Sequence, residues 1–271
     1  MAVNVSKTKY ILFRPKGTRI DIDLDKHGVV YNSNEIGMPD NPKNIFKQGR
    51  IYNDNPDKND RSYKFLGIYL DEYLSYDTHC STVCKKLAMS NFMLNRAKNF
   101  LTPHTLRTLY FSLIHPHLLY GLPIYSCTTQ KNISKIFKLQ KKTIRIISKA
   151  KYNANTSPLF HSLKILPLKH LITYSKGLLI HSIYHKYSPP ALHNTWITNE
   201  QRGGDHDLRN ANDLYVPLAR TEHVKRLTYF SLPTTWNNLP DDKLNPNQTT
   251  FRIAFKYYLH ELSNNDPENE L

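Results

Sequence analysis

The chain has 271 residues, of which 39% are hydrophobic, and could form one large domain or two or three small ones. Its 37 Lys and Arg exceed its 22 Asp and Glu, so the net charge is +15 and a polyanionic partner is expected. The 3 cysteines exclude a disulfide-rich secreted domain, and no apolar run reaches the roughly 18 residues needed to span a bilayer. Together with the lack of a signal-peptide pattern, this predicts a soluble, intracellular protein without a membrane partner, in either nucleus or cytoplasm.

The first region, residues 1–76, is predicted to be a small antiparallel sheet. Short strands are expected at 10–13, 20–25 and 29–31, and a polar insertion rich in Asn, Asp and Pro at 32–60. The nearly continuous apolar run at 63–71 predicts one strand buried on both faces. Gly67 in its middle lacks a side chain, so another backbone or a nucleic-acid strand can come close there.

Helical patterns follow over residues 77–152. A helix is expected from Asp77 or Thr78 to about Phe100, and another from Thr102 and Pro103, because proline is favoured at a first helical position. A third helix is expected at 132–149. The apolar stripe predicted for the first helix comprises Val83, Leu87, Met93, Leu94 and Ala97.

The last region, residues 153–271, is predicted to be mostly helical. Helices are expected at 158–163, 168–187 and 249–262, with a polar linker at 200–213 and a small unit around 214–217. Trp236 is interpreted as a packing anchor. The whole pattern predicts an α+β fold, in which a small antiparallel sheet precedes a large helical part.

The helix at 132–149 is unusually basic, because Lys and Arg recur throughout 131–151 and no acidic residue does. Spacings of three and four place most of these cations along one broad side of the helix, where they repel one another unless phosphate neutralises them. A solvated outer face is the alternative, although such faces usually mix both signs. The predicted nucleic-acid-binding residues are Lys131, Lys135, Lys138, Lys141, Lys142, Arg145 and Lys149.

No metal site is predicted. Asp21, Asp23 and Asp25 alternate as on a solvated strand face, and the glycine and glutamate that a calcium loop requires are missing. The Asp-Asp pair at 241–242 follows a proline in a turn. Cys80 and Cys84 with His79 are too few for a closed zinc site, so the two thiols are interpreted as small core residues.

Four motifs occur in an order that resembles the C-terminal half of the reverse transcriptases of non-LTR (LINE-type) retrotransposons. They are Asn4-x-x-Lys7-Thr8, then Lys64-Phe65-Leu66-Gly67, then Gln140-Lys141-x-x-x-Arg145-Ile146-Ile147, and finally Trp236-Asn237-x-Leu239-Pro240. The resemblance implies that 1–76 is the end of a palm, and that 77–152 is a thumb with its basic helix.

The resemblance also implies roles for individual residues. Lys7 becomes the candidate general acid near the leaving pyrophosphate; a plain basic residue at a strand edge is the alternative. Lys64, Phe65, Leu66 and Gly67 become the strand that grips the primer. In this reading Phe65 and Leu66 pack between palm and thumb, while Gly67 lies near the primer end.

The catalytic Tyr-x-Asp-Asp hairpin of such polymerases would precede Met1. We therefore expect a polymerase fragment that binds an RNA or DNA template-primer and is inactive without an N-terminal half supplied in trans. Mg²⁺ is expected only in the intact parent polymerase, and no cofactor is expected on this chain. A stand-alone nucleic-acid-binding protein and a non-functional relic of a retroelement are the alternatives.

Overall fold

The computed structural model describes Phe13 and residues 62–202, 211–240 and 245–265. The chain divides into two units, Met1–His79 and Cys80–Leu271, which are described separately. The strands expected at 20–25 and 29–31 and the polar insertion at 32–60 lie outside the described residues. The region boundaries predicted at 76/77 and 152/153 stay predictions.

The apolar run at 63–71 forms a hairpin, so the prediction of one continuous strand is wrong. Strands β1 (Ser62–Phe65) and β2 (Ile68–Asp71) pair antiparallel, with Lys64 opposite Tyr69. Leu66 (φ 45°) and Gly67 (φ 86°) form the two-residue turn. Two positive φ angles mark the turn type whose twist matches that of the flanking strands. Gly67 therefore serves the turn, and the expected close approach of another strand is not needed to explain it.

A single carboxylate organises the connection from β2 to the first helix, α3 (Asp77–Ala97). Asp71 accepts hydrogen bonds from the backbone N–H groups of Ser75 (3.0 Å) and Tyr76 (2.8 Å). Leu74 and Tyr76 have positive φ angles of 50° and 57°, which side chains other than glycine adopt at a cost. These bonds, together with the one that the N–H of Leu74 donates to the Asp71 carbonyl (3.0 Å), hold the segment in place before α3 begins.

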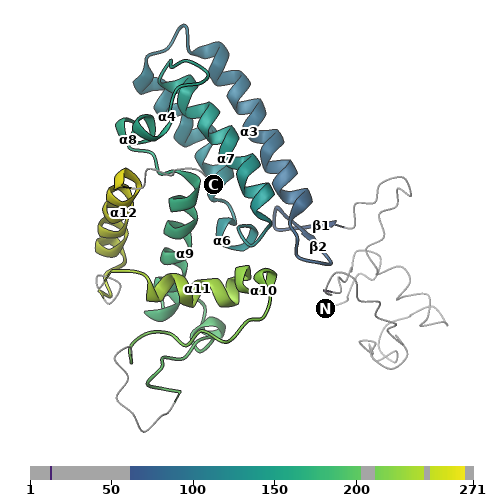
Figure 1. Cartoon of the computed structure of the whole chain (residues 1–271), viewed down its shortest axis with the longest axis vertical. Helices are drawn as coiled ribbons and strands as arrows, with labels where there is room; N and C mark the ends of the chain where they lie inside the picture. Colours follow the sequence, from purple (N-terminus) through teal and green to yellow (C-terminus); the bar gives the residue numbers. More distant parts are fainter. Residues whose placement is uncertain (1–12, 14–61, 203–210, 241–244, 266–271) are drawn as a thin grey trace, which may run out of the picture. The chain divides into compact units, whose positions relative to one another are not determined.

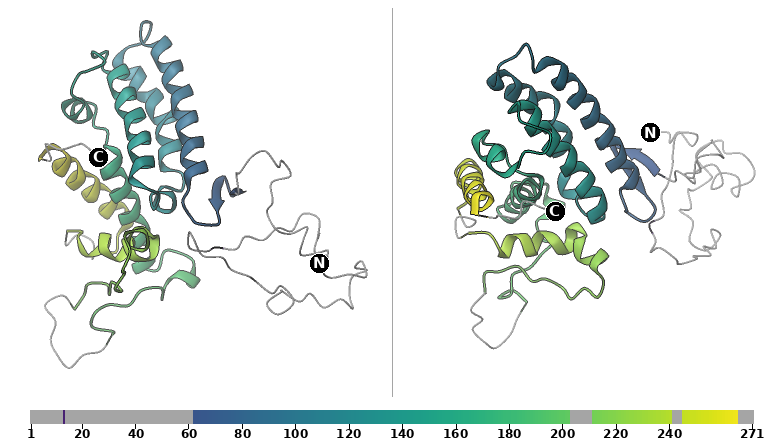
Figure 2. Two further views of the ribbon diagram at one scale, coloured as in Figure 1. Left: turned by 45° about the vertical axis from the view of Figure 1, so that its right-hand side comes forward. Right: turned by 45° about the horizontal axis from the view of Figure 1, so that its top comes forward.

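Helices α3, α4 (Pro103–Leu113) and α7 (Gln130–Ile147) lie side by side (Figures 1 and 2), joined by α5 (His115–Leu119) and α6 (Leu122–Tyr125). The helices predicted from the sequence are present, with ends shifted by a few residues. Asn91 of α3 joins it to α7, because its amide donates to the Leu139 carbonyl (3.0 Å) and accepts from the Thr143 hydroxyl (2.6 Å). The side chains that fill this core include Leu87, Leu94, Leu106, Tyr110, Leu118, Ile136, Ile144 and Ile147.

The C-terminal part of the chain packs around one helix, α9 (Leu168–Tyr184), against which α11 (Thr228–Asn237) and α12 (Gln248–Asn265) lie (Figure 1). Shorter helices are α8 (Ser157–Ser162), the 3-10 helix η2 (Pro190–Leu192) and α10 (Glu222–Arg226). At Gly177 a Cβ atom would lie 2.4 Å from the Phe255 ring. The absent side chain therefore lets α9 and α12 approach closely. A small two-stranded sheet followed by these helices confirms the α+β fold.

Trp236 is a packing anchor, as predicted. It is completely buried, and its ring centroid lies 4.5 Å from that of Tyr184. The next residue, Asn237, accepts from the N–H of Leu214 and donates to the carbonyl of Leu214, both at 2.9 Å. The Trp-Asn-x-Leu-Pro segment thus ties α11 to a distant loop. The buried cluster around it comprises Leu166, Ile180, Leu214, Leu232, Trp236, Leu239, Phe251, Phe255 and Leu259.

Candidate nucleic-acid interface

Four lysines on the outer side of α7 form one exposed row, which we call the lysine stripe: Lys131, Lys135, Lys138 and Lys142. Their spacing of four, three and four residues places them above one another on the same helix face. The row is roughly 16 Å long at 1.5 Å of rise per residue. Because α7 carries no acidic residue, no carboxylate within the helix neutralises these charges.

The opposite face of α7 fixes the direction in which the stripe points. Ile136, Ile144 and Ile147 are completely buried. Gln140 is completely buried as well, and its amide donates to the Tyr110 hydroxyl and to the Leu166 carbonyl, both at 3.0 Å. Apolar packing and these two hydrogen bonds hold one side of the helix in the core, so the lysines on the other side face solvent.

The other three cations predicted to bind nucleic acid have different surroundings. The Lys141 ammonium lies 4.5 Å from the centroid of the Phe137 ring, a cation–π contact within the helix. Arg145 donates from Nε to the carbonyl of Ala154 (2.9 Å) and so fastens the loop after α7. Lys149 follows the helix end with a φ of 51°. These contacts give all three a structural role, and their predicted contact with nucleic acid stays a prediction.

Lys149 closes α7 in a Schellman motif. Its N–H donates to the Ile146 carbonyl (3.2 Å), and the N–H of Ala150 donates to the Arg145 carbonyl (3.0 Å). The same pair of hydrogen bonds ends α8 at Lys164 and α9 at Lys186, whose φ angles are 52° and 61°. Three helices therefore end with a lysine in the left-handed conformation, which glycine adopts more readily.

Replacing Lys149 with glycine should increase the free energy of unfolding by about 0.5–1 kcal/mol. A residue with a side chain is about 1–2 kcal/mol less stable than glycine in the left-handed conformation. Glycine has more freedom in the unfolded chain, and this offsets part of the stability gained by the substitution. Urea denaturation followed by circular dichroism measures the change. Lys186→Gly, at the end of α9, is the matched variant and should show the same sign. A loss of stability in both variants would contradict this account of the two helix ends.

Helix α3 lies beside the stripe and adds a feature that sequence reasoning missed. Lys135 is near enough to Cys84 of α3 to lower the pKa of its thiol, although burial is the larger effect and leaves that pKa raised. Further along α3, Phe92 is 61% exposed and the Arg96 guanidinium lies 5.6 Å from its ring centroid. Met93, predicted to be buried, is 42% exposed. In the sequence, this exposed surface is indicated only by the helical spacing of Met89, Phe92, Arg96 and Phe100, which places them on one helix face.

The hairpin residues predicted to grip a primer lie at the β1–β2 turn in the other unit. Lys64 is exposed, with its ammonium 6.0 Å from the Tyr69 ring centroid. Phe65 and Leu66 are 56% and 75% exposed, and their expected packing between palm and thumb stays a prediction. The structure brings Lys64, Phe65, Leu66 and Gly67 together at one hairpin tip. The contact of this hairpin tip with a primer stays a prediction.

The remaining predicted residues have separate outcomes. Lys7, the candidate general acid, and the aspartates at 21–25 and 241–242 lie outside the described residues. Cys80 is buried, as interpreted from the sequence, whereas Cys84 is partly exposed. Across residues 62–202, 211–240 and 245–265, no three His, Cys, Asp or Glu side chains form a group that could hold a metal ion. None of the described helices is both long and apolar enough to cross a membrane.

Comparison with known proteins identifies relatives from fruit flies. Over 109 residues, 39% of the chain, the sequence is 31% identical to the RNA-directed DNA polymerase from mobile element jockey of Drosophila melanogaster, of which this stretch covers 12%. Over 127 residues, 44% of the chain, it is 27% identical to the probable RNA-directed DNA polymerase from transposon BS of the same species, covering 14% of that protein. The jockey polymerase of Drosophila funebris is 28% identical over 107 residues, with 12% of its length covered.

No family model and no solved structure matches the chain. The relatives are much longer than the stretch they share with it, since that stretch spans 12–14% of their length. The resemblance inferred from the motifs is nevertheless confirmed by these three alignments. The chain is similar in sequence to the RNA-directed DNA polymerases of non-LTR retrotransposons.

Proposed function

We propose that the chain is a template-primer-binding part of an RNA-directed DNA polymerase from a non-LTR retrotransposon, and that it holds the nucleic-acid backbone through the lysine stripe of α7. The observation that carries this proposal is the stripe itself, four exposed lysines on a helix that has no acidic residue. The similarity to retrotransposon polymerases supports it, because an RNA-directed DNA polymerase must bind both RNA and DNA.

The chemistry of the stripe suits a phosphate backbone. Ammonium groups on one helix face repel one another, and this repulsion is relieved when phosphates replace the counterions around them. Contacts of this kind position a strand without reading its bases. The exposed Phe92 with Arg96 on α3 offers a second kind of contact, since aromatic rings and guanidinium groups stack on unpaired bases.

We assign the metal-dependent part of catalysis to other parts of the polymerase. The described residues contain no group of three His, Cys, Asp or Glu side chains that could hold a metal ion. A two-metal mechanism of nucleotide transfer needs carboxylates that hold both ions. In this proposal Mg²⁺ and the catalytic aspartates belong to an upstream polymerase half, and Lys7 supplies a proton to the leaving pyrophosphate. Both assignments are tested by mixing the chain with such a half and measuring primer extension, with Lys7→Ala as the variant.

Substituting Lys138→Gln and Lys142→Gln together should raise the dissociation constant for an RNA–DNA hybrid about tenfold. It should also reduce the slope of log affinity against log salt by up to about two, because each lost phosphate contact releases roughly one fewer counterion. Fluorescence anisotropy with a labelled hybrid, at several salt concentrations, measures both quantities.

The control is Lys186→Gln with Lys225→Gln, which removes the same charge from exposed sites away from α7. Equal weakening by both double variants would mean that net charge alone drives binding, and the stripe would lose its assigned role. If the wild-type chain binds and yet restores no primer extension with an upstream half, the stand-alone alternative gains support. A wild-type chain with no affinity for nucleic acid would contradict the proposal.

A further inference from the structure

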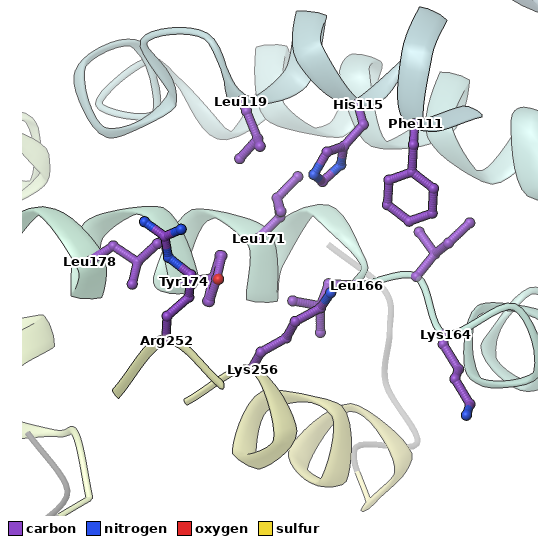
Figure 3. Close-up of a pocket in the computed structure, with 11 residues that line it drawn as sticks. Phe111, His115, Leu119, Lys164, Leu166, Leu171, Tyr174, Leu178, Arg252 and Lys256 are labelled. Atoms are coloured by element: carbon purple, nitrogen blue, oxygen red, sulfur yellow. The ribbon is translucent and has the colours of Figure 1, made fainter. Parts of the chain in front are cut away.

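A pocket lined by residues of α4, α5, α9 and α12 and of the segment before α9 has no part in the proposed template-primer contact. It lies where α4 and α5 face α9 and α12, and its volume is about 330 Å³. Figure 3 shows His115 and Leu119 pointing toward Leu171 of α9, while Arg252 and Lys256 extend from α12 on the other side. The volume is at the lower end of the range typical of pockets that bind small organic molecules.

The inner wall of the pocket is largely aliphatic. Leu166 and Leu171 are buried at 6% and 2% exposure, and Leu119 and Leu178 continue the apolar surface toward the opening. Such a wall binds an apolar or flat organic group more favourably than a hydrated ion. The ligand therefore needs a body with apolar surface.

Three cations line the pocket: Lys164, Arg252 and Lys256. In Figure 3 the side chain of Lys164 extends away from the other two. All three are exposed, and no carboxylate is paired with any of them among the residues that the structure describes. Arg252 also lies close enough to Tyr174 to affect its phenol. Burial raises the pKa of Tyr174, and the positive charge of Arg252 lowers it by a smaller amount. Arg252 and Lys256 lie one helical turn apart on α12, so they project from the same face of that helix.

His115 adds a polar group inside the apolar wall. Its Nδ1 atom is buried and has no hydrogen-bond partner within the described part of the chain. Burial, and then the nearby charge of Lys256, lower the pKa of the imidazole to about 4. The ring is therefore neutral at neutral pH and adds no charge to the pocket wall.

We propose that this pocket binds an organic phosphate monoester, with the phosphate held by Arg252 and Lys256 and the organic body placed against the leucines. Two cations match a phosphate monoester, which carries about −1.5 to −2 charges at pH 7, better than a singly charged carboxylate. The guanidinium of Arg252 can bind two phosphate oxygens at once. A nucleoside monophosphate has both parts, and it is available as a free nucleotide or as the phosphorylated end of a strand.

Isothermal titration of the full chain with adenosine monophosphate tests the assignment, with inorganic phosphate as the comparison. Saturable binding of the nucleotide is expected, at least tenfold tighter than that of inorganic phosphate, because the leucine wall binds only the organic body. The double variant Arg252→Gln/Lys256→Gln should weaken nucleotide binding at least tenfold. Since both side chains are exposed, the variant should keep the thermal stability of the wild type.

The stripe variant Lys138→Gln/Lys142→Gln is the matched control and should leave nucleotide binding unchanged, so this proposal and the proposed template-primer contact can fail separately. Equal binding of nucleotide and inorganic phosphate, or equal binding by wild type and Arg252→Gln/Lys256→Gln, would overturn the assignment.

A 5′-phosphorylated and a 5′-hydroxyl oligonucleotide then distinguish whether the bound phosphate belongs to a strand end or to a free nucleotide. Tighter binding of the phosphorylated strand that depends on Arg252 and Lys256 identifies a strand end, and equal binding identifies the free nucleotide.

Discussion

Replacing Trp236 with alanine is expected to lower the free energy of unfolding by about 3–5 kcal/mol, the range for truncating a buried aromatic side chain. The indole is completely buried, and its ring centroid lies 4.5 Å from that of Tyr184, the last residue of α9, and 6.4 Å from that of the following His185. Its removal would leave a cavity between α9 and α11. Because most small domains have only about 5–15 kcal/mol of stability, this part of the chain would come close to unfolding at 25 °C.

Urea denaturation measured by far-ultraviolet circular dichroism tests this expectation. Tyr257→Ala is the matched control, since it removes another large aromatic side chain, from α12, that is 70% exposed. The control should change the free energy of unfolding by less than about 0.5 kcal/mol. A loss of under 1 kcal/mol for Trp236→Ala would mean that the neighbouring helices close the cavity, and that the tryptophan is not the anchor of the cluster.

The helices could be predicted from the sequence because their signals are local. Thr102 followed by Pro103 marks the start of α4, and the Thr102 hydroxyl accepts from the N–H of Thr105 (3.3 Å) as the capping pattern predicts. The hairpin at 62–71 could not be distinguished from a single strand in the same way. Its turn consists of Leu66 and Gly67, and leucine is an unusual residue for a positive φ angle, so the usual Asn-Gly or Asp-Gly signal is absent.

The candidate site was only partly predictable for a related reason. Helical spacing placed the cations of α7 on one broad side, and the exposed stripe confirms that placement for Lys131, Lys135, Lys138 and Lys142. Spacing could not reveal that Arg145 donates to the carbonyl of Ala154, because that partner lies in a loop beyond the helix. The pocket lined by Arg252 and Lys256 depends on contacts among helices distant in sequence, and no motif marks it.

Replacing Gln140 with leucine is expected to cost about 2–4 kcal/mol of folding free energy, although the side-chain volume changes little. The substitution removes two buried hydrogen bonds, to the Tyr110 hydroxyl and to the Leu166 carbonyl. The Tyr110 hydroxyl and the Leu166 carbonyl both lose the Gln140 amide as a donor, and each buried polar group that loses its partner costs about 1–3 kcal/mol. Because Gln140 links α7 to α4 and to the start of α9, its loss weakens the support that points the lysine stripe outward. Chemical denaturation measures the change.

A double-mutant cycle with Tyr110→Phe separates the hydrogen bond from general damage to the core. In Gln140→Leu the Tyr110 hydroxyl loses its donor, and Tyr110→Phe removes that hydroxyl. The free energy of unfolding of the double variant should therefore be at least about 1 kcal/mol higher than the sum of the two single losses predicts. Burial raises the pKa of the Tyr110 phenol, so the hydroxyl stays protonated and the cycle can be measured at any neutral pH. Strict additivity of the two losses would show that Gln140 and Tyr110 contribute independently. In that case leucine destabilises the chain by packing badly, and the orientation of α7 depends on its apolar face alone.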